Sequence, residues 1–151
     1  MHKGAQRKTL EAEKLADLTF ELVDRCHEKQ QIIAGTVGVT VAEFKVLRAF
    51  GTDSRLAGMD LSERVGLSGS RMTRILDGLV LKKLVQREIG AKDRRTMEIL
   101  LTDEGKRITQ KLRRSYISTH VNIMQFLPEG VEESVILAME KLRDAMRLWG
   151  A

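Results

Sequence analysis

The stretch LSERVGLSGSRMTRILDGLVLKKLVQREIGAKDRRTMEILLT, residues Leu61–Thr102, decides the fold of this 151-residue chain. Its first part predicts a short helix over Asp60–Val65 that ends at Gly66, because glycine readily takes the left-handed conformation common after a helix. Ser68 is expected to cap a longer helix from Gly69 to about Lys83. The apolar residues of this longer helix fall on one face, namely Met72, Ile75, Leu76, Leu79, Val80 and Leu84.

The second part of the stretch predicts a β-hairpin. Leu84–Ile89 and Thr96–Leu101 alternate apolar and polar residues well enough to pair as strands. The loop between them, Gly90–Arg95, is basic and contains glycine. The sequence RLAGM at residues 55–59 is either a loop or a short first strand of the same sheet. This order predicts a mainly α (α+β) winged helix-turn-helix domain with a wing of two to three strands.

Two helices are predicted before this stretch. Apolar residues at helical spacing indicate a helix that Thr9 caps and that runs to residue 33 or 34, with residues 1–8 frayed. Thr40 and Glu43 fit the T-x-x-E pattern of a capping box, which starts the second helix. The first helix is longer than a small domain needs, so part of its apolar face is expected to contact another subunit.

Two more helices are predicted after the stretch. Thr102 is expected to cap a helix that continues to about Phe126. A last helix follows over Val131–Trp149. The predicted domains are a winged helix-turn-helix domain at residues 35–103 and a helical dimerisation region at residues 1–34 and 104–151.

The positive charge is confined to the predicted winged domain. The chain has a formal net charge of +5, whereas residues 64–95 contain nine basic and three acidic residues and carry +6. The rest of the chain therefore carries −1. The nine basic residues are Arg64, Arg71, Arg74, Lys82, Lys83, Arg87, Lys92, Arg94 and Arg95. Such a confined excess indicates a nucleic-acid partner, here double-stranded DNA.

The exposed N-terminal turns of the longer helix hold the residues expected to read DNA, because a helix enters the major groove and presents these turns to base edges. They are Ser70, Arg71, Thr73 and Arg74. Arginine bonds guanine bidentately, and Ser68 and Ser70 beside free backbone N–H groups suit phosphate oxygens. The alternative is a solvated helix face with incidental arginines.

The loop of the wing holds the second group of expected DNA contacts. Lys92, Arg94 and Arg95 place three positive charges in one turn, which costs self-repulsion unless an anion binds there. A narrow minor groove attracts an inserted arginine. Asp93 is expected to orient a neighbouring arginine, since phosphates would repel its carboxylate. The alternative is a merely solvated turn.

The segments LSERVGLSGSRMTRILDGLVLKKLVQRE (residues 61–88) and KDRRTMEILLTDEGK (residues 92–106) resemble the MarR family of transcription regulators. The resemblance is strong over about residues 40–112. It implies a homodimer, held by the first and the last two helices, whose two winged domains read a pseudo-palindromic operator. Ser68, Ser70, Arg71, Thr73 and Arg74 would then face the major groove, and Arg94 or Arg95 the minor groove.

The resemblance also implies a ligand-responsive repressor. Its effector would be a small molecule such as a phenolic or another lipophilic anion, lodged between the dimer helices and the winged domain. The chain departs from the family at two positions, where members often have proline in place of Gly69 and glycine in place of Lys83. Lys83 adds a candidate phosphate contact.

Cys26 is the one cysteine of the chain. Some MarR-like proteins sense oxidants through a cysteine in the first helix, which makes Cys26 a candidate redox sensor. Its neighbours Arg25 and His27 do not face it on a helix, so neither need activate the thiol. The other interpretation is a buried, inert thiol.

The sequence also predicts what the protein is not expected to be or to bind. No apolar run approaches the roughly 18 residues of a membrane helix, no signal peptide is visible, and a lone cysteine fits a reducing compartment, so we predict a cytoplasmic location and no membrane partner. The histidines His2, His27 and His120 lie far apart, and no nucleophile lies beside a base. We therefore predict no enzyme, no metal and no cofactor. A protein-interaction module without a DNA role stays open.

Overall fold

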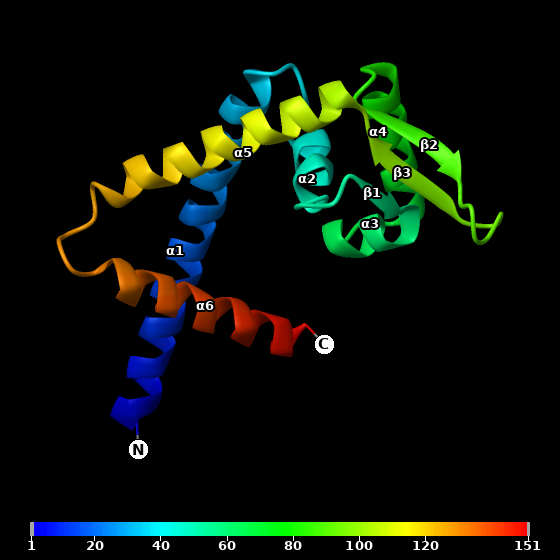
Figure 1. Cartoon of the computed structure of the whole chain (residues 1–151). Coiled ribbons are helices and arrows are strands. Elements are labelled where there is room, and N and C mark those ends of the chain that lie inside the picture. Colours follow the sequence, from blue (N-terminus) through cyan, green and yellow to red (C-terminus); the bar gives the residue numbers. More distant parts are fainter. Residues whose placement is uncertain (1, 151) are drawn as a thin grey trace. The chain divides into compact units, whose positions relative to one another are not determined.

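The computed structural model describes residues 2–150, with side chains for residues 4–150, as two compact units that divide between Arg113 and Arg114 (Figure 1). The elements are α1 (His2–Gly35), α2 (Val41–Ala49), β1 (Arg55–Ala57), α3 (Gly58–Val65), α4 (Gly69–Leu81), β2 (Val85–Ile89), β3 (Met97–Leu101), α5 (Asp103–Met124) and α6 (Glu132–Trp149). The first unit holds all elements up to the start of α5, and the second holds the rest of α5 and α6. The predicted mainly α fold with a winged helix-turn-helix is confirmed.

Helix α1 begins earlier than predicted, at His2. The Thr9 hydroxyl donates to the carbonyl of Ala5 at 3.0 Å, so Thr9 lies within the helix and does not cap it. The predictions of a Thr9 cap and of frayed residues 1–8 are therefore wrong, apart from residue 1, which lies outside the described residues. Alanine, glutamine, lysine and arginine in this segment favour helix, and polarity alone does not end one.

The caps of α2 and α3 agree with the sequence. The backbone N–H of Glu43 donates to the Thr40 hydroxyl at 3.1 Å, and the Glu43 carboxylate accepts from the N–H of Thr40 at 2.8 Å, which is the predicted capping box. Helix α3 starts two residues before the predicted bound, and Gly66 closes it with φ +72°. Ser68 takes the N-cap position of α4 with an extended backbone, but its side chain makes no capping hydrogen bond, contrary to the prediction.

The sheet has three strands in the order β1-β3-β2, with both pairs antiparallel. The RLAGM segment therefore supplies the short first strand. Val85 pairs with Leu101 and Ile89 pairs with Met97, so β2 and β3 form one hairpin. Figure 1 shows the loop of this hairpin at its free end, beyond the helices of the first unit.

The core lies in the first unit, between α2, α3 and α4 and the sheet. Its fully buried side chains are Val46, Leu47, Phe50, Leu61, Leu79, Val85, Ile99 and Leu112. It extends beyond residues 35–103 to Ile33 and Ala34 before them and to Ile108 and Leu112 after them. Val80, which was expected on the apolar face of α4, is 39% exposed, because the face buried against the sheet ends at Leu79. No described residue of α6 is buried.

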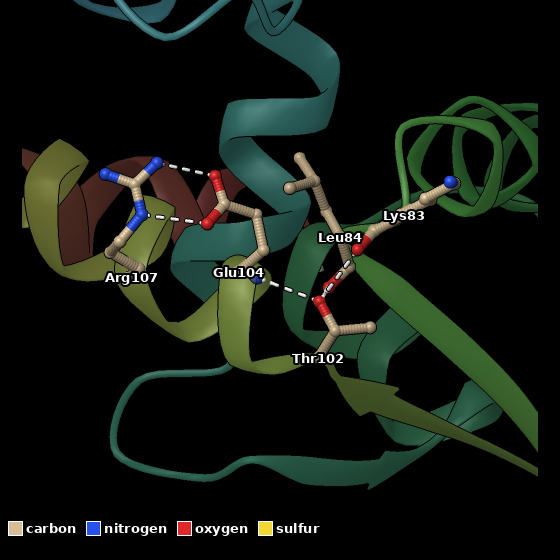
Figure 2. A network of polar contacts seen from close by, with 6 residues as sticks. Lys83, Leu84, Thr102, Glu104 and Arg107 are labelled. Atoms are coloured by element: carbon tan, nitrogen blue, oxygen red, sulfur yellow. Dashed lines mark hydrogen bonds and ion pairs between the residues drawn. The ribbon is translucent and has the colours of Figure 1, made fainter.

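The turn after α4 is fastened to the start of α5 (Figure 2). The Thr102 hydroxyl donates toward the carbonyls of Lys83 and Leu84, at 2.8 and 3.2 Å. The same oxygen accepts from the N–H of Gly105 at 2.9 Å, which confirms the predicted cap. The N–H of Thr102 also donates to the carbonyl of Leu84. Thr102 therefore fixes the turn after α4 against the first turn of α5.

An ion pair within α5 lies beside this junction. Arg107 donates to both carboxylate oxygens of Glu104, at 2.8 and 2.5 Å (Figure 2). This hydrogen bonding holds the pKa of Glu104 below its ordinary value, with Coulombic attraction acting in the same direction and desolvation against it. Because the pKa is lowered in the folded state, the pair stabilises the fold above the ordinary glutamate pKa and stops doing so as the pH falls through the folded value.

Lys83 is a described non-glycine residue with a left-handed backbone, at φ +59°. This conformation costs a residue with a Cβ atom about 1 kcal/mol relative to glycine, partly offset by the greater freedom of glycine in the unfolded chain. We expect Lys83→Gly to raise the free energy of unfolding by up to about 1 kcal/mol in urea denaturation. Lys82→Gly is the control and should destabilise the fold, because Lys82 is right-handed at φ −78° and pairs with Glu43. Equal losses at both positions would contradict the expectation.

No helix among the described residues is both long enough and apolar enough to cross a membrane.

Candidate nucleic-acid interface

Helix α4 presents its predicted DNA-reading residues to solvent. Met72 is 3% exposed and Leu79 is fully buried, so the opposite side of the helix faces outward. That outward side carries the exposed residues Ser68, Ser70, Arg71, Thr73 and Arg74, all at the start of the helix. The Thr73 hydroxyl donates to the carbonyl of Gly69 at 2.9 Å, so its hydrogen is used within the helix while its oxygen can still accept. The structure thus brings the predicted helix residues together on one exposed surface.

Three of the nine basic residues of this region are already paired within the chain. Arg64 contacts the carboxylate of Asp53 at 2.9 Å and the carbonyl of Ala49 at 3.1 Å. Lys82 reaches the carboxylate of Glu43 at 2.6 Å, and Arg87 reaches that of Asp77 at 2.7 Å. These three cations therefore stabilise contacts within the domain.

The other six basic residues are exposed and form no ion pair with any residue that the structure describes. We call them the six unpaired cations: Arg71, Arg74, Lys83, Lys92, Arg94 and Arg95. Five of them are the basic residues predicted from the sequence to contact DNA, and the sixth is Lys83. Their charge is available to an anion because no carboxylate of the described chain neutralises it.

The loop of the wing is ordered by its own backbone. The N–H of Gly90 donates to the carbonyl of Thr96 at 2.8 Å, and the hydroxyl of Thr96 donates to the carbonyl of Asp93 at 2.7 Å. The Asp93 carboxylate accepts from the backbone N–H of Arg95 at 2.9 Å, not from its guanidinium. Asp93 therefore shapes the turn that carries Arg95, which differs from the expectation of a side-chain pair.

A cluster of three charged side chains, which the sequence did not predict, lies on the face of the sheet opposite the buried Ile99. Glu88 and Glu98 are direct partners in the β2–β3 register. Arg55 of β1 pairs with both carboxylates, at 3.0 Å to Glu88 and at close range to Glu98. The arginine neutralises two like charges that would otherwise repel across the hairpin. Only the strand register reveals this cluster.

The remaining candidate residues lie outside this surface. Cys26 lies on α1, where it is partly exposed in the single chain. His27 contacts Gln31 on α1, and His120 contacts the carbonyl of Tyr116 on α5. Within residues 4–150, no group of three or more histidine, cysteine or acidic side chains is placed to hold a metal ion. The side chain of His2 lies outside the described residues.

A profile of the MarR family matches residues 37–96, which run from just before α2 into the wing. This match covers the whole exposed surface of α4 and all six unpaired cations, and it begins just before the capping segment of α2. Over this segment, which is less than half of its length, the chain matches the MarR family. The resemblance found in the sequence is thereby confirmed, and MarR-family proteins are transcription regulators.

Relatives and solved structures agree with this assignment. The chain is 37% identical over 68 residues to the HTH-type transcriptional repressor MdtR of Bacillus subtilis, a match that covers 45% of this chain and 44% of MdtR. The chain thus spans less than half of the length of that curated relative. The YusO protein from Bacillus subtilis is 25% identical, with a TM-score of 0.68 over 91% of this chain and 97% of YusO.

A DNA complex is among the solved structures with this fold. A cysteine-to-serine mutant of MarR from E. coli, complexed with operator DNA, has a TM-score of 0.75 at 21% identity. The likeness covers 87% of this chain and 95% of that chain. At this identity the comparison shows a shared winged helix fold.

Proposed function

We propose that this MarR-family chain is a sequence-specific, DNA-binding transcription regulator that binds a pseudo-palindromic operator as a homodimer. The observation that carries the proposal is the distribution of the six unpaired cations. Five lie where a helix and a wing would meet DNA (Arg71, Arg74, Lys92, Arg94 and Arg95), whereas three other basic residues of the same domain are paired internally. The DNA-bound MarR of the same fold supports it.

The proposed contacts divide between base reading and backbone binding. In α4, Arg71, Thr73 and Arg74 face the major groove, and Ser68 and Ser70 bind phosphate oxygens. In the wing, Arg94 or Arg95 enters the minor groove beside Lys92, on a turn that Asp93 shapes. The buried face of α4 keeps these side chains outward.

A homodimer is supported by apolar side chains that the single chain leaves exposed. Helix α1 exposes Leu15, Leu18 and Leu22 at fractions of 46 to 52%, and Trp149 near the chain end is 90% exposed. So much exposed apolar surface is unusual in a monomer. A second copy would cover this surface. The dimer would hold its two copies of α4, the proposed recognition helices, about 34 Å apart, which is one turn of DNA.

The proposed regulation is repression relieved by a small molecule. The effector would be a phenolic or another lipophilic anion, and it would weaken binding by favouring a conformer in which the two winged domains lose their spacing. MdtR, to which this chain is 37% identical over 68 residues, is a transcriptional repressor. The cytoplasm stays the predicted compartment, on the evidence of the single cysteine and of DNA as the proposed partner.

Fluorescence anisotropy with the DNA upstream of the chain's own reading frame tests the proposal. We expect this duplex to bind at least a hundredfold more tightly than a scrambled duplex of equal length at physiological salt, because specific sites typically exceed non-specific DNA by more than this ratio. The affinity should fall steeply as salt rises, since phosphate contacts release counterions. Equal affinity for both duplexes would reject the specific-regulator proposal.

A further inference from the structure

A cleft of about 1010 Å³ lies between α3, the start of the proposed recognition helix α4 and the wing. Its walls are largely apolar and include Met59 of α3, Met72 and Leu76 of α4, and Met97 and Ile99 of β3. Side chains of the wing therefore do not fill the space against the exposed part of α4. The buried core residues Leu79, Val85 and Ile99 hold α4 against the base of the sheet, so a further contact is needed only for the part of the wing beside the start of α4.

Arg87 of β2 spans this cleft. One Nη atom lies 2.7 Å from the carboxylate of Asp77, and the other donates to the carbonyl of Thr73 at 3.2 Å. Asp77 and Thr73 are four residues apart and so lie one turn apart on the same face of α4. The planar guanidinium of Arg87 therefore contacts two residues of α4 that lie one helical turn apart.

The backbone of Arg87 is held in the sheet by the pairing of β2 with β3. Arg87 is paired with Ile99 in the β2–β3 register, two residues from the buried Val85. Its side chain is 30% exposed, less than that of Asp77 at 59%. Among the residues that the structure describes, Arg87 makes the side-chain hydrogen bonds that join the β2–β3 hairpin to α4. No second polar link of this kind bridges the cleft in residues 4–150.

We infer that Arg87 is a positioning residue that sets the distance and angle between the recognition helix and the wing. Both of its Nη atoms are used within the chain, so it differs in role from the six unpaired cations. The inference rests on the proposed DNA-binding function, because it concerns the simultaneous fit of α4 and the wing to one duplex. Loss of the bridge leaves both elements folded but no longer held at one spacing.

Three variants of the full-length protein test this inference: Arg87→Met, which keeps the aliphatic stem, Asp77→Asn, and Asp77→Arg combined with Arg87→Asp. Each single change should weaken binding to the upstream duplex about tenfold, because the bridge is lost from either side. The salt dependence should stay unchanged, since no phosphate contact is removed. The charge exchange should recover most of the lost affinity. Arg107→Met, which removes a paired arginine from α5, is the matched control and should bind normally.

Amide hydrogen exchange of the free protein supplies a readout without DNA. We expect faster exchange in β2, β3 and the loop between them in both single variants, and protection restored by the charge exchange. This readout tests the positioning role even if the wild-type protein binds no DNA, in which case the proposed function fails alone. Unchanged exchange would overturn the inference. It would also be overturned if Arg87→Met lowered the salt slope by about one per subunit while Asp77→Asn bound normally, since Arg87 would then contact phosphate.

Discussion

Replacing Arg74 and Arg95 together by alanine is expected to lower the affinity for the upstream duplex about a thousandfold while leaving the fold intact. One arginine lies on the outward face of α4 and the other in the loop of the wing, so the double change removes one contact from each groove. A homodimer loses four guanidinium groups, and each well-placed contact contributes roughly 1–3 kcal/mol. Neither side chain pairs with a described carboxylate, so the free energy of unfolding should change by less than about 0.5 kcal/mol.

The matched control is Arg64→Ala combined with Lys82→Ala. It removes the same charge from the same domain, but from cations that are already paired with Asp53 and Glu43. Here the fold should weaken by about 1–3 kcal/mol, mainly because the buried Glu43 carboxylate loses a partner, and DNA affinity should fall far less. Anisotropy and urea denaturation of both double variants measure the two effects. Similar losses of affinity in both would show that net charge alone, not the six unpaired cations, drives binding.

The same pair of variants separates the regulator from a protein-interaction module. Under the second hypothesis, the basic surface of α4 and the wing has no direct DNA role. The wild-type chain would then bind the upstream duplex no better than the Arg74 and Arg95 double variant does. A partner protein captured equally by both would support the module.

The fold was predictable because its signals are local. The T-x-x-E box at Thr40, Gly66 after α3 and the alternating strands of the wing each depend on residues a few positions apart. Burial of one face of α4 followed directly from apolar spacing. The exposed positions Arg71, Thr73 and Arg74 then followed from the same period, so the helix half of the candidate site was predictable too.

What the sequence could not reveal depends on contacts between distant segments. The partners of Arg64 and Lys82 lie 11 and 39 residues away, so these cations looked the same as the six unpaired ones. Arg87 was counted only among the nine basic residues of this region, and its ion pair with Asp77 could not be read from the sequence. The start of α1 was missed for a different reason, since its first residues lack an apolar pattern although they favour helix.

Gly105→Ala is expected to destabilise the fold by about 3 kcal/mol. A Cβ atom at this position would lie 1.9 Å from the carbonyl oxygen of Leu84 and 2.9 Å from its carbon. That oxygen belongs to the backbone and accepts hydrogen bonds from the N–H and the hydroxyl of Thr102, at 3.1 and 3.2 Å, so it cannot move away without breaking them. Overpacking of this kind costs about 1–3 kcal/mol or more, which exceeds the roughly 1 kcal/mol that alanine gains in a helix.

Gly69 and Gly78 provide matched comparisons for Gly105, because replacing each of the three by alanine adds one methyl group to a helix. At Gly69 no atom lies within 4 Å of the new Cβ, so alanine should be neutral or stabilise by up to about 1 kcal/mol. At Gly78 the nearest atom is a carboxylate oxygen of Glu43 at 2.6 Å, on a side chain held by Thr40 and Lys82, so an intermediate loss of about 1 kcal/mol is expected. Urea denaturation should therefore rank the variants Gly69→Ala, Gly78→Ala and Gly105→Ala in order of falling stability. If Gly105→Ala had the stability of the wild-type protein, α5 would not be in tight contact with the turn after α4. A shift of α5 could then not be transmitted to α4 through this contact.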